Sequence, residues 1–351
     1  MELRQRALKA MEDLLSVQWR APRNISYRKN GCVGAKLFHY ETDKIYAGIP
    51  YTNGDMGLMQ FLEYYDEESG MLKFDGTNEE FNQQLGGTCA CGVMWSWCTV
   101  CHSLTGEFVN YDMVKKYGCI PVGSYEYDYS IDSFRELQTK DIMEKHGKDV
   151  MFDAYAHVLP ADAVESSNNN HTMMCLSPAH TVYTEDGKID GEESYIIIRD
   201  QRGGYKKDFY EVEEDGETVH YSGRTAFKYS FNRLWDEWYL PVTTAEFLGT
   251  EPYQPAEVAL DCEVKSLADL QNASVRCNYP MAVVKVIAAD ADGAESRIAM
   301  RTIRKKEVRS GLARNCPISE LHLEVPGWAK KIRLEVVATT GEVFTPVQLD
   351  V

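Results

Sequence analysis

The hydrophobic pattern of this 351-residue chain changes its period near residue 150, and this change limits the folds that it can adopt. Before that point, apolar residues recur at helical spacing, as in MELRQRALKAMEDLLSVQWR, where Leu3, Ala7, Met11, Leu14 and Val17 share one face. After it, the apolar segments are short and rich in β-branched residues, and turn signals such as EDGKIDG separate them. Helices followed by an antiparallel sheet are typical of the α+β class.

A second change of pattern predicts a second domain. The segments TMMCLS, HTVYTE and SYIIIRDQ read as strands, and VTTAEFLGTEPYQPAEV reads as a linker because its periodicity is weak. The strand-like segments VALDCEV, ASVRCNY, MAVVKVIAAD and LHLEV follow, and ATTGEVF marks a terminal hairpin. We therefore predict an α+β domain in residues 1–245, a linker in 246–255, and an all-β, immunoglobulin-like sandwich in 256–351.

Composition excludes several classes of partner. Acidic residues outnumber basic ones by 54 to 37, which gives a net charge of −17. Nucleic acid is therefore not expected as a partner, because phosphate binding needs clustered Lys and Arg. No apolar run approaches the ~18–20 residues of a membrane span. The N-terminal segment reads as a charged amphipathic helix rather than a signal peptide, so the sequence by itself favours a cytoplasmic location.

The segment GTCACGVMWSWCTVCH, residues 87–102, admits three interpretations: haem attachment, a metal site or a nucleophile. CTVCH fits the C-x-x-C-H pattern of haem attachment, but the motif is short and no export route is visible. Zinc would need Cys89, Cys91, Cys98 and Cys101 to converge, which four residues of one continuous helix cannot do. We therefore expect neither a metal nor another cofactor. The isolated cysteines are expected to be small buried hydrophobes: Cys119, Cys175, Cys262 and Cys277.

The nucleophile interpretation follows from local geometry. Gly86 and Gly87 precede Cys89, and an apolar helical period with Val93 and Trp97 on one face follows it. Cys89 is thus expected at a helix N-terminus, where free N–H groups and the helix dipole stabilise a thiolate and an oxyanion. Cys91 would point about 200° away from Cys89 around that helix and is expected to pack in the core.

Four short stretches resemble the NlpC-type cell-wall cysteine peptidases and their CHAP-type relatives. GGTCACGVMWSW resembles their nucleophile segment, and AGIPYTNG at 47–54 resembles their Gly-x-Pro-Tyr-x-x-Gly stretch. NNNHTMMCLS resembles the segment in which the family histidine opens a core strand. SYIIIRDQ resembles the strand that ends in the family's third polar site residue, after the cysteine and the histidine. The resemblance covers about residues 45–205. Thr88 and Ala90 depart from it, because the family usually has Asp and Ser there.

The resemblance implies a papain-like fold for the first domain and assigns roles in the order Cys, His, acid. Cys89 would be the nucleophile, His171 the general base and acid, and Asp200 the residue that orients the imidazole. Along SYIIIRDQ the period of two places Asp200 on the same face as Ile196 and Ile198, within reach of a neighbouring strand. Gln201 is the alternative orienting or substrate-binding residue. His180 is a competing base.

The resemblance also implies a substrate. Family members hydrolyse amide bonds of peptidoglycan stem peptides, so the expected partner is such a peptide and the expected place of action is the cell wall. Tyr51 would line the pocket and bind substrate or support the oxyanion. Two alternatives remain open: a degenerate domain whose sandwich binds a glycan or a protein, and a hydrolase of other γ-glutamyl or isopeptide bonds. Thr88 and Ala90 favour the first alternative, and the absent signal peptide favours the second.

Overall fold

The computed structural model describes residues 2–30, 35–104, 119–126, 138–201, 210–221, 223–310 and 312–351. The chain forms two compact units, Met1–Pro252 and Tyr253–Val351. The first unit combines helices with one antiparallel and one mixed sheet, and the second is mainly β, so the protein belongs to the α+β class. The structure corrects the start of the predicted linker, because Ala245–Leu248 is a short helix, α9, within the first unit. Thr244 caps this helix by accepting a hydrogen bond from the backbone N–H of Phe247.

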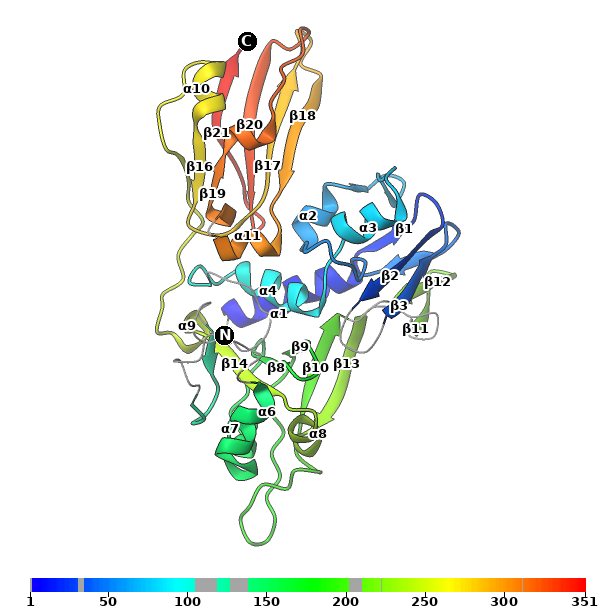
Figure 1. The fold of residues 1–351 in the computed structure, drawn as a ribbon, viewed down its shortest axis with the longest axis vertical. Coiled ribbons are helices and arrows are strands. Elements are labelled where there is room, and N and C mark those ends of the chain that lie inside the picture. Colours follow the sequence, from blue (N-terminus) through cyan, green and yellow to red (C-terminus); the bar gives the residue numbers. More distant parts are fainter. Residues whose placement is uncertain are drawn as a thin grey trace. The chain divides into compact units, whose positions relative to one another are not determined.

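The two helices that the sequence predicts, at the N-terminus and after Gly87, both form, and further helices have clear caps. The N-terminal period gives α1 (Glu2–Ser16), which buries Ala7, Met11 and Leu14. In α3 (Asn78–Gln84), Thr77 and Glu80 form a reciprocal capping box that satisfies two N-terminal N–H groups. The apolar segment after the glycine pair gives α4 (Cys89–Cys98), which packs beside α1 (Figure 1). The remaining helices of this unit are α2 (Leu58–Leu62), α6 (Thr139–His146), α7 (Lys148–Ala156) and α8 (Phe231–Asp236).

The central sheet of the first unit is antiparallel throughout and has the strand order β13-β10-β9-β8-β14-β7. Its strands are β7 (Cys119–Pro121), β8 (Ala163–Ser166), β9 (His171–Cys175), β10 (Tyr195–Gln201), β13 (Gly223–Ser230) and β14 (Leu240–Thr244). α4 packs against β9 and β10. Apolar side chains of α6, α7 and α8 form one cluster with residues of β8, β9 and β10. The middle strands are therefore buried almost completely.

The strands of a second sheet have the order β11-β12-β4-β1-β6-β5, with parallel pairing between β1 and β6 and between β12 and β4. These are β1 (Gln18–Arg20), β4 (Ile45–Ala47), β5 (Tyr65–Asp66), β6 (Met71–Leu72), β11 (Tyr210–Glu214) and β12 (Glu217–Tyr221). A separate hairpin pairs β2 (Ile25–Asn30) with β3 (Ala35–Tyr40). Its Tyr27 and Phe38 rings stack with centroids 5.3 Å apart and join an aromatic core around Trp19 and Tyr40.

The second unit contains two antiparallel sheets. One has the order β15-β16-β19 and the other β18-β17-β20-β21. The strands are β15 (Val258–Leu260), β16 (Ser274–Cys277), β17 (Met281–Ala289), β18 (Glu295–Thr302), β19 (Asn315–Pro317), β20 (Lys331–Ala338) and β21 (Val343–Asp350). Short helices are α10 (Leu267–Asn272), α11 (Lys305–Ser310), η2 (Leu312–Arg314) and η3 (Ile318–Leu321). The predicted terminal hairpin is confirmed as β20–β21.

Three sequence predictions are wrong. HTVYTE forms no strand and makes only isolated bridges at His180 and Tyr183. LHLEV is not a strand either: Leu321 ends η3, and His322 adopts a left-handed conformation with φ 49°. Cys262 is exposed, because it lies in a surface bend after β15, whereas Cys119, Cys175 and Cys277 are buried as expected. Apolar composition alone did not reveal which segments have a partner strand.

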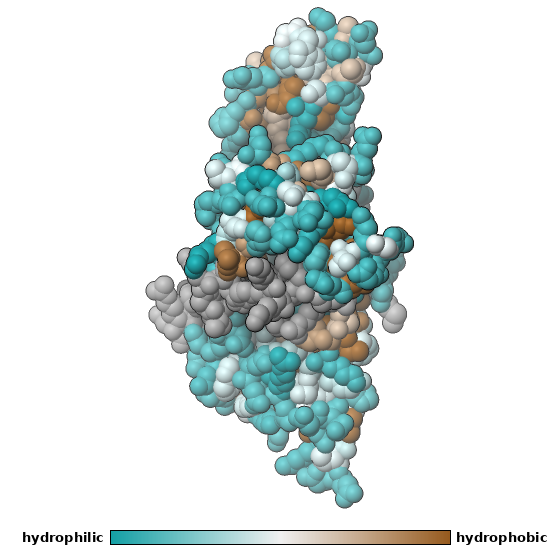
Figure 2. Space-filling view, turned by 90° about the vertical axis from the view of Figure 1, so that its right-hand side faces the viewer, coloured by the Kyte–Doolittle hydropathy of each residue, from teal (hydrophilic) through white to brown (hydrophobic). Residues whose placement is uncertain are grey.

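The surface agrees with the acidic, polar composition. On the face shown in Figure 2, the coloured atoms are mostly hydrophilic, and hydrophobic residues occur in small separate groups. Within the described ranges, no helix has the length and apolarity that crossing a membrane would require.

Candidate active site

Cys89 is the first residue of α4, at the point where a buried helix begins. All ten residues of α4 are buried. The sequence predicted an apolar stripe on one face of this helix. Instead the helix is buried on every side, as is typical of a core helix. Thr88 is the N-cap, but its side chain makes no capping hydrogen bond. Its hydroxyl lies 3.4 Å from Sγ of Cys91 instead. The first N–H groups of the helix and its dipole thus favour negative charge beside Cys89.

The glycine pair before Cys89 allows two chain segments to approach closely. Gly86 has φ +79°, a conformation that side chains disfavour. A Cβ atom on Gly87 would lie 2.6 Å from the carbonyl oxygen of Met56, so no larger residue fits there. The Gly87 N–H donates to Pro50 O at 2.9 Å, and the Met56 N–H donates to Gly86 O at 2.9 Å. The segment that leads into Cys89 is therefore fixed against residues 50–56.

His171 and Asp200 come from adjacent antiparallel strands. His171 opens β9, and Asp200 lies near the end of β10. Nε2 of His171 lies 2.8 Å from Oδ2 of Asp200. Ile196, Ile198 and Asp200 are all fully buried, in keeping with the period of two that places them on one face. The side chain of His171 keeps 13% of its surface exposed, so the imidazole remains accessible from one side.

Cys89 and His171 are close enough for the charge of each to shift the pKa of the other. Because Nε2 is engaged by Asp200, the ring nitrogen available to the thiol is Nδ1. Burial by itself would raise the pKa of the thiol, but the His171 charge and hydrogen bonds outweigh burial and lower this pKa to about 6. Burial would lower the pKa of His171, but Cys89 and Asp200 raise it to about 9. Both shifts favour a thiolate–imidazolium pair near neutral pH.

Tyr51 and Asn170 complete the surroundings of the sulfur. The Tyr51 hydroxyl lies 3.7 Å from Sγ of Cys89 and can donate to it. The Tyr51 ring packs on Phe38 at a centroid distance of 6.0 Å, and Nζ of Lys29 lies 4.7 Å from the Tyr51 centroid. The backbone carbonyl of Asn170 lies 3.9 Å from Sγ. Asn170 has φ 48°, a left-handed conformation that Asn tolerates better than most residues.

Gln201 does not have the role that the sequence suggested. Its side-chain amide donates to Ile49 O at 3.2 Å and to Gly87 O at 3.4 Å, while Asp200 is the residue that contacts His171. Gln201 has no exposed surface. We therefore correct both of its predicted roles: it neither orients the imidazole nor lies where a substrate could touch it.

The competing residues lie elsewhere. The ring of His180 stacks on Tyr195 with centroids 4.7 Å apart, in the loop that precedes β10. Cys91 is fully buried, and its Sγ lies 3.8 Å from Oδ1 of Asp55. Sγ of Cys101 lies 3.3 Å from the hydroxyl of Thr244. Cys89, Cys91 and Cys101 thus have different neighbours. Among the described residues, no three His, Cys, Asp or Glu side chains form a group suited to a metal ion.

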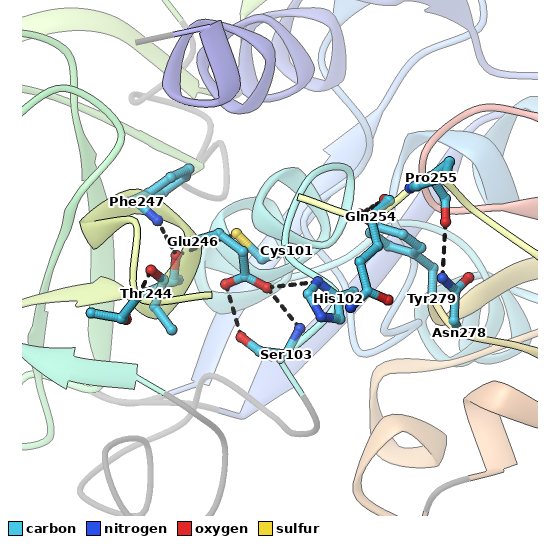
Figure 3. Close-up of polar contacts among 12 residues, drawn as sticks. Cys101, His102, Ser103, Thr244, Glu246, Phe247, Gln254, Pro255, Asn278 and Tyr279 are labelled. Carbon is cyan, nitrogen blue, oxygen red and sulfur yellow. Dashed lines mark hydrogen bonds and ion pairs between the residues drawn. The ribbon is translucent and has the colours of Figure 1, made fainter. Parts of the chain in front are cut away.

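His102 belongs to a structural cluster around a buried carboxylate (Figure 3). The carboxylate of Glu246 accepts hydrogen bonds of 2.8 Å from both the backbone N–H and the hydroxyl of Ser103. Nδ1 of His102 lies 3.2 Å from Oε1 of Glu246. This cluster fastens the segment after α4 to α9, and it holds the C-terminal side of the helix that begins at Cys89.

Comparison with known proteins adds no relative. No protein-family model matches the chain, and neither the curated proteins nor the solved structures contain a significant match. The chemistry of the site therefore has to be inferred from its own geometry.

Sequence reasoning missed two contributors to this site. Asn170 precedes His171 in the run NNN, which signals a turn and so a left-handed residue next to the strand. Lys29 donates from Nζ to Thr52 O at 2.5 Å and is buried beside Tyr51. No local pattern identifies Lys29, because its neighbours here come from a distant part of the chain.

Proposed function

We propose that the first unit is a cysteine hydrolase of amide bonds. The observation that carries this proposal is the 2.8 Å hydrogen bond between His171 and Asp200, next to a cysteine whose pKa the His171 charge lowers. A thiol at a helix N-terminus, a base and an orienting acid are the three parts that nucleophilic catalysis needs. Structural burial alone would raise the pKa of a cysteine, whereas the surroundings of Cys89 lower it.

In the proposed first step, the Cys89 thiolate attacks the carbonyl carbon of the substrate and forms a C–S bond. The carbonyl oxygen becomes an oxyanion, which the backbone N–H groups at the start of α4 and the Tyr51 hydroxyl stabilise. The His171 imidazolium then donates its proton to the leaving nitrogen. The C–N bond breaks, an amine departs and a thioester remains on Cys89.

In the second step, water replaces the amine. Neutral His171 accepts a proton from the water, whose oxygen attacks the thioester carbon. Collapse of the second oxyanion releases the carboxylic acid, and the thiolate–imidazolium pair forms again. Asp200 holds the imidazole in one orientation and stabilises its positive charge through both steps.

The fold and the local resemblance support a papain-like assignment and a cell-wall substrate. A helix that begins at a cysteine and packs against the antiparallel strand that begins at a histidine is the arrangement expected of that class. We propose peptidoglycan stem peptides as the substrate and an immunoglobulin-like sandwich for the second unit. In this proposal the second unit provides a surface for a glycan or protein ligand.

The experiment compares cleavage by the full chain with cleavage by Cys89→Ala, on defined stem peptides and on isopeptide or γ-glutamyl peptides. Mass spectrometry should find an amine and an acid product from stem peptides with the wild type and neither with the variant. If only the isopeptide or γ-glutamyl peptides are cleaved, the proposed cell-wall substrate is wrong but the proposed hydrolysis by Cys89 stands. Cys89 that reacts with iodoacetamide like an ordinary thiol, with no cleavage of either group, would overturn the hydrolase proposal.

A further inference from the structure

Gln201 occupies a position that connects three parts of the candidate site. It follows Asp200 directly at the end of β10. Its side chain is fully buried, and its amide nitrogen donates to Ile49 O at 3.2 Å and to Gly87 O at 3.4 Å. Ile49 lies two residues before Tyr51, and Gly87 lies two residues before Cys89. The Gln201 amide is therefore hydrogen-bonded to both segments that approach the sulfur, two residues before Tyr51 in one and two residues before Cys89 in the other.

These two segments already touch each other at this point. Tyr51 and Gly87 form a parallel bridge, and the Thr52 N–H donates to Gly87 O at 3.0 Å. The Gly87 carbonyl thus accepts from both Thr52 and Gln201. Because both acceptors are carbonyl oxygens, the amide must turn its nitrogen toward them, which fixes its orientation. Gln201 adds the third element, since its strand also carries the acid that orients His171.

The helix leaves room for this side chain. Gly92 of α4 faces Gln201, and a Cβ atom on Gly92 would lie 3.3 Å from Oε1 of Gln201 and 3.2 Å from Sδ of Met11. Among the described residues, Oε1 of Gln201 has no hydrogen-bond partner. Burial of such a group is unfavourable. An apolar side chain would fill the same space without that cost, so the amide nitrogen is the part of Gln201 that the site requires.

We propose that Gln201 is a positioning residue that sets the separation of Cys89 from His171 by tying β10 to the segments that carry Tyr51 and Cys89. This inference rests on the proposed function, because it concerns the same thiol and imidazole. Gln201 touches neither the reacting atoms nor the substrate. Its effect is transmitted through Ile49 O and Gly87 O.

The test is the pH dependence of Cys89 alkylation by iodoacetamide in the full chain, with other cysteines monitored by peptide mass spectrometry. Gln201→Met keeps the length of the side chain and removes the donor. We expect its apparent thiol pKa to rise and its alkylation rate constant at pH 7 to fall about tenfold or more, because less thiolate is present. Ile196→Val, also buried on β10, is the matched control and should leave the profile unchanged.

The outcomes separate this inference from the proposed function. The wild-type thiol pKa could be lower than that of an ordinary thiol and depend on His171, and yet be unchanged in Gln201→Met. This result would overturn the positioning role and leave the hydrolase proposal intact. A wild-type thiol with an ordinary pKa would instead overturn the proposed function. If Gln201→Met does not fold, Gln201→Glu replaces it in the same experiment. Glu keeps the shape of the side chain but places an oxygen, in place of the amide nitrogen, against two carbonyl oxygens. At pH 7 it should also slow alkylation, and an unchanged rate would count against the inference.

Discussion

His171 and Asp200 are joined by a hydrogen bond between a partly accessible imidazole and a fully buried carboxylate, at 2.8 Å from Nε2 to Oδ2. One side of the imidazole is therefore accessible, while the other side is held inside the protein. Water cannot easily replace Asp200 because the carboxylate has no accessible surface. The hydrogen bond to the Asp200 side chain thus fixes the direction in which Nε2 of His171 points.

Replacing that side chain should therefore impair the reaction. Asp200→Asn keeps the shape but removes the negative charge, so the His171 pKa should fall and the wrong tautomer should be favoured. We expect kcat/KM on a cleaved peptide to fall by about 10²–10⁴-fold. Asp153→Asn, at an exposed position of α7, is the control. Retention of full activity in Asp200→Asn would show that Asp200 does not orient the base.

The reactivity of Cys89 should follow the thiolate–imidazolium pair. The pair forms as pH rises through the thiol pKa of about 6 and is lost as pH rises through the His171 pKa of about 9. Hydrolysis should therefore show a bell-shaped dependence on pH between these limits. In His171→Ala, burial is no longer opposed by the imidazolium, so alkylation of Cys89 should require much higher pH. A lowered thiol pKa that persists in His171→Ala would contradict the pairing.

The Tyr51 hydroxyl should matter more for turnover than for binding. Tyr51→Phe retains the ring that packs on Phe38 and removes the group 3.7 Å from Sγ. Loss of one oxyanion donor lowers kcat by about 10²–10³-fold in well-studied cases. We expect at least a tenfold fall in kcat with little change in KM. A variant that changed only KM would identify Tyr51 as a binding residue instead.

The carboxylate of Glu246 should stabilise the first unit without affecting the thiol. Glu246→Ala leaves the Ser103 N–H without its acceptor, and we expect a loss of about 2–4 kcal/mol in the free energy of unfolding. Urea unfolding would measure this loss, and hydrogen exchange would show whether the Ser103 amide has become less protected. Glu251→Ala, at an exposed position after α9, should have almost no effect. The pKa of Cys89 should be the same in both variants.

Local signals explain which parts of the fold could be predicted from the sequence. α1 has a clear period, α3 has a clear cap, and α4 is an apolar run that follows a glycine pair. β9 and β10 are short apolar runs that become the middle of a sheet. The period of two along β10 also explains why Asp200 lies inward beside His171. These features depend on neighbours in sequence, so the chain itself reveals them.

Features that depend on distant partners could not be predicted. In the sheet around β1 and β6, four of the strands have only two or three residues and no periodicity of their own: β1, β4, β5 and β6. HTVYTE has strand-like composition but lacks a partner strand. The contacts of Gln201 with Ile49 and Gly87 join residues 152 and 114 positions apart. No window of sequence contains both members of such a contact.

The burial of α4 on every side has a consequence for how this protein can change. The helix that supplies the thiol is also part of the hydrophobic core, so substitutions along it alter stability before they alter specificity. Mutational tolerance should therefore be lowest in α4 and higher in the exposed parts of the segments that surround the sulfur. Laboratory evolution of a new substrate preference would then begin near Tyr51 and the turn before His171, with the helix kept intact.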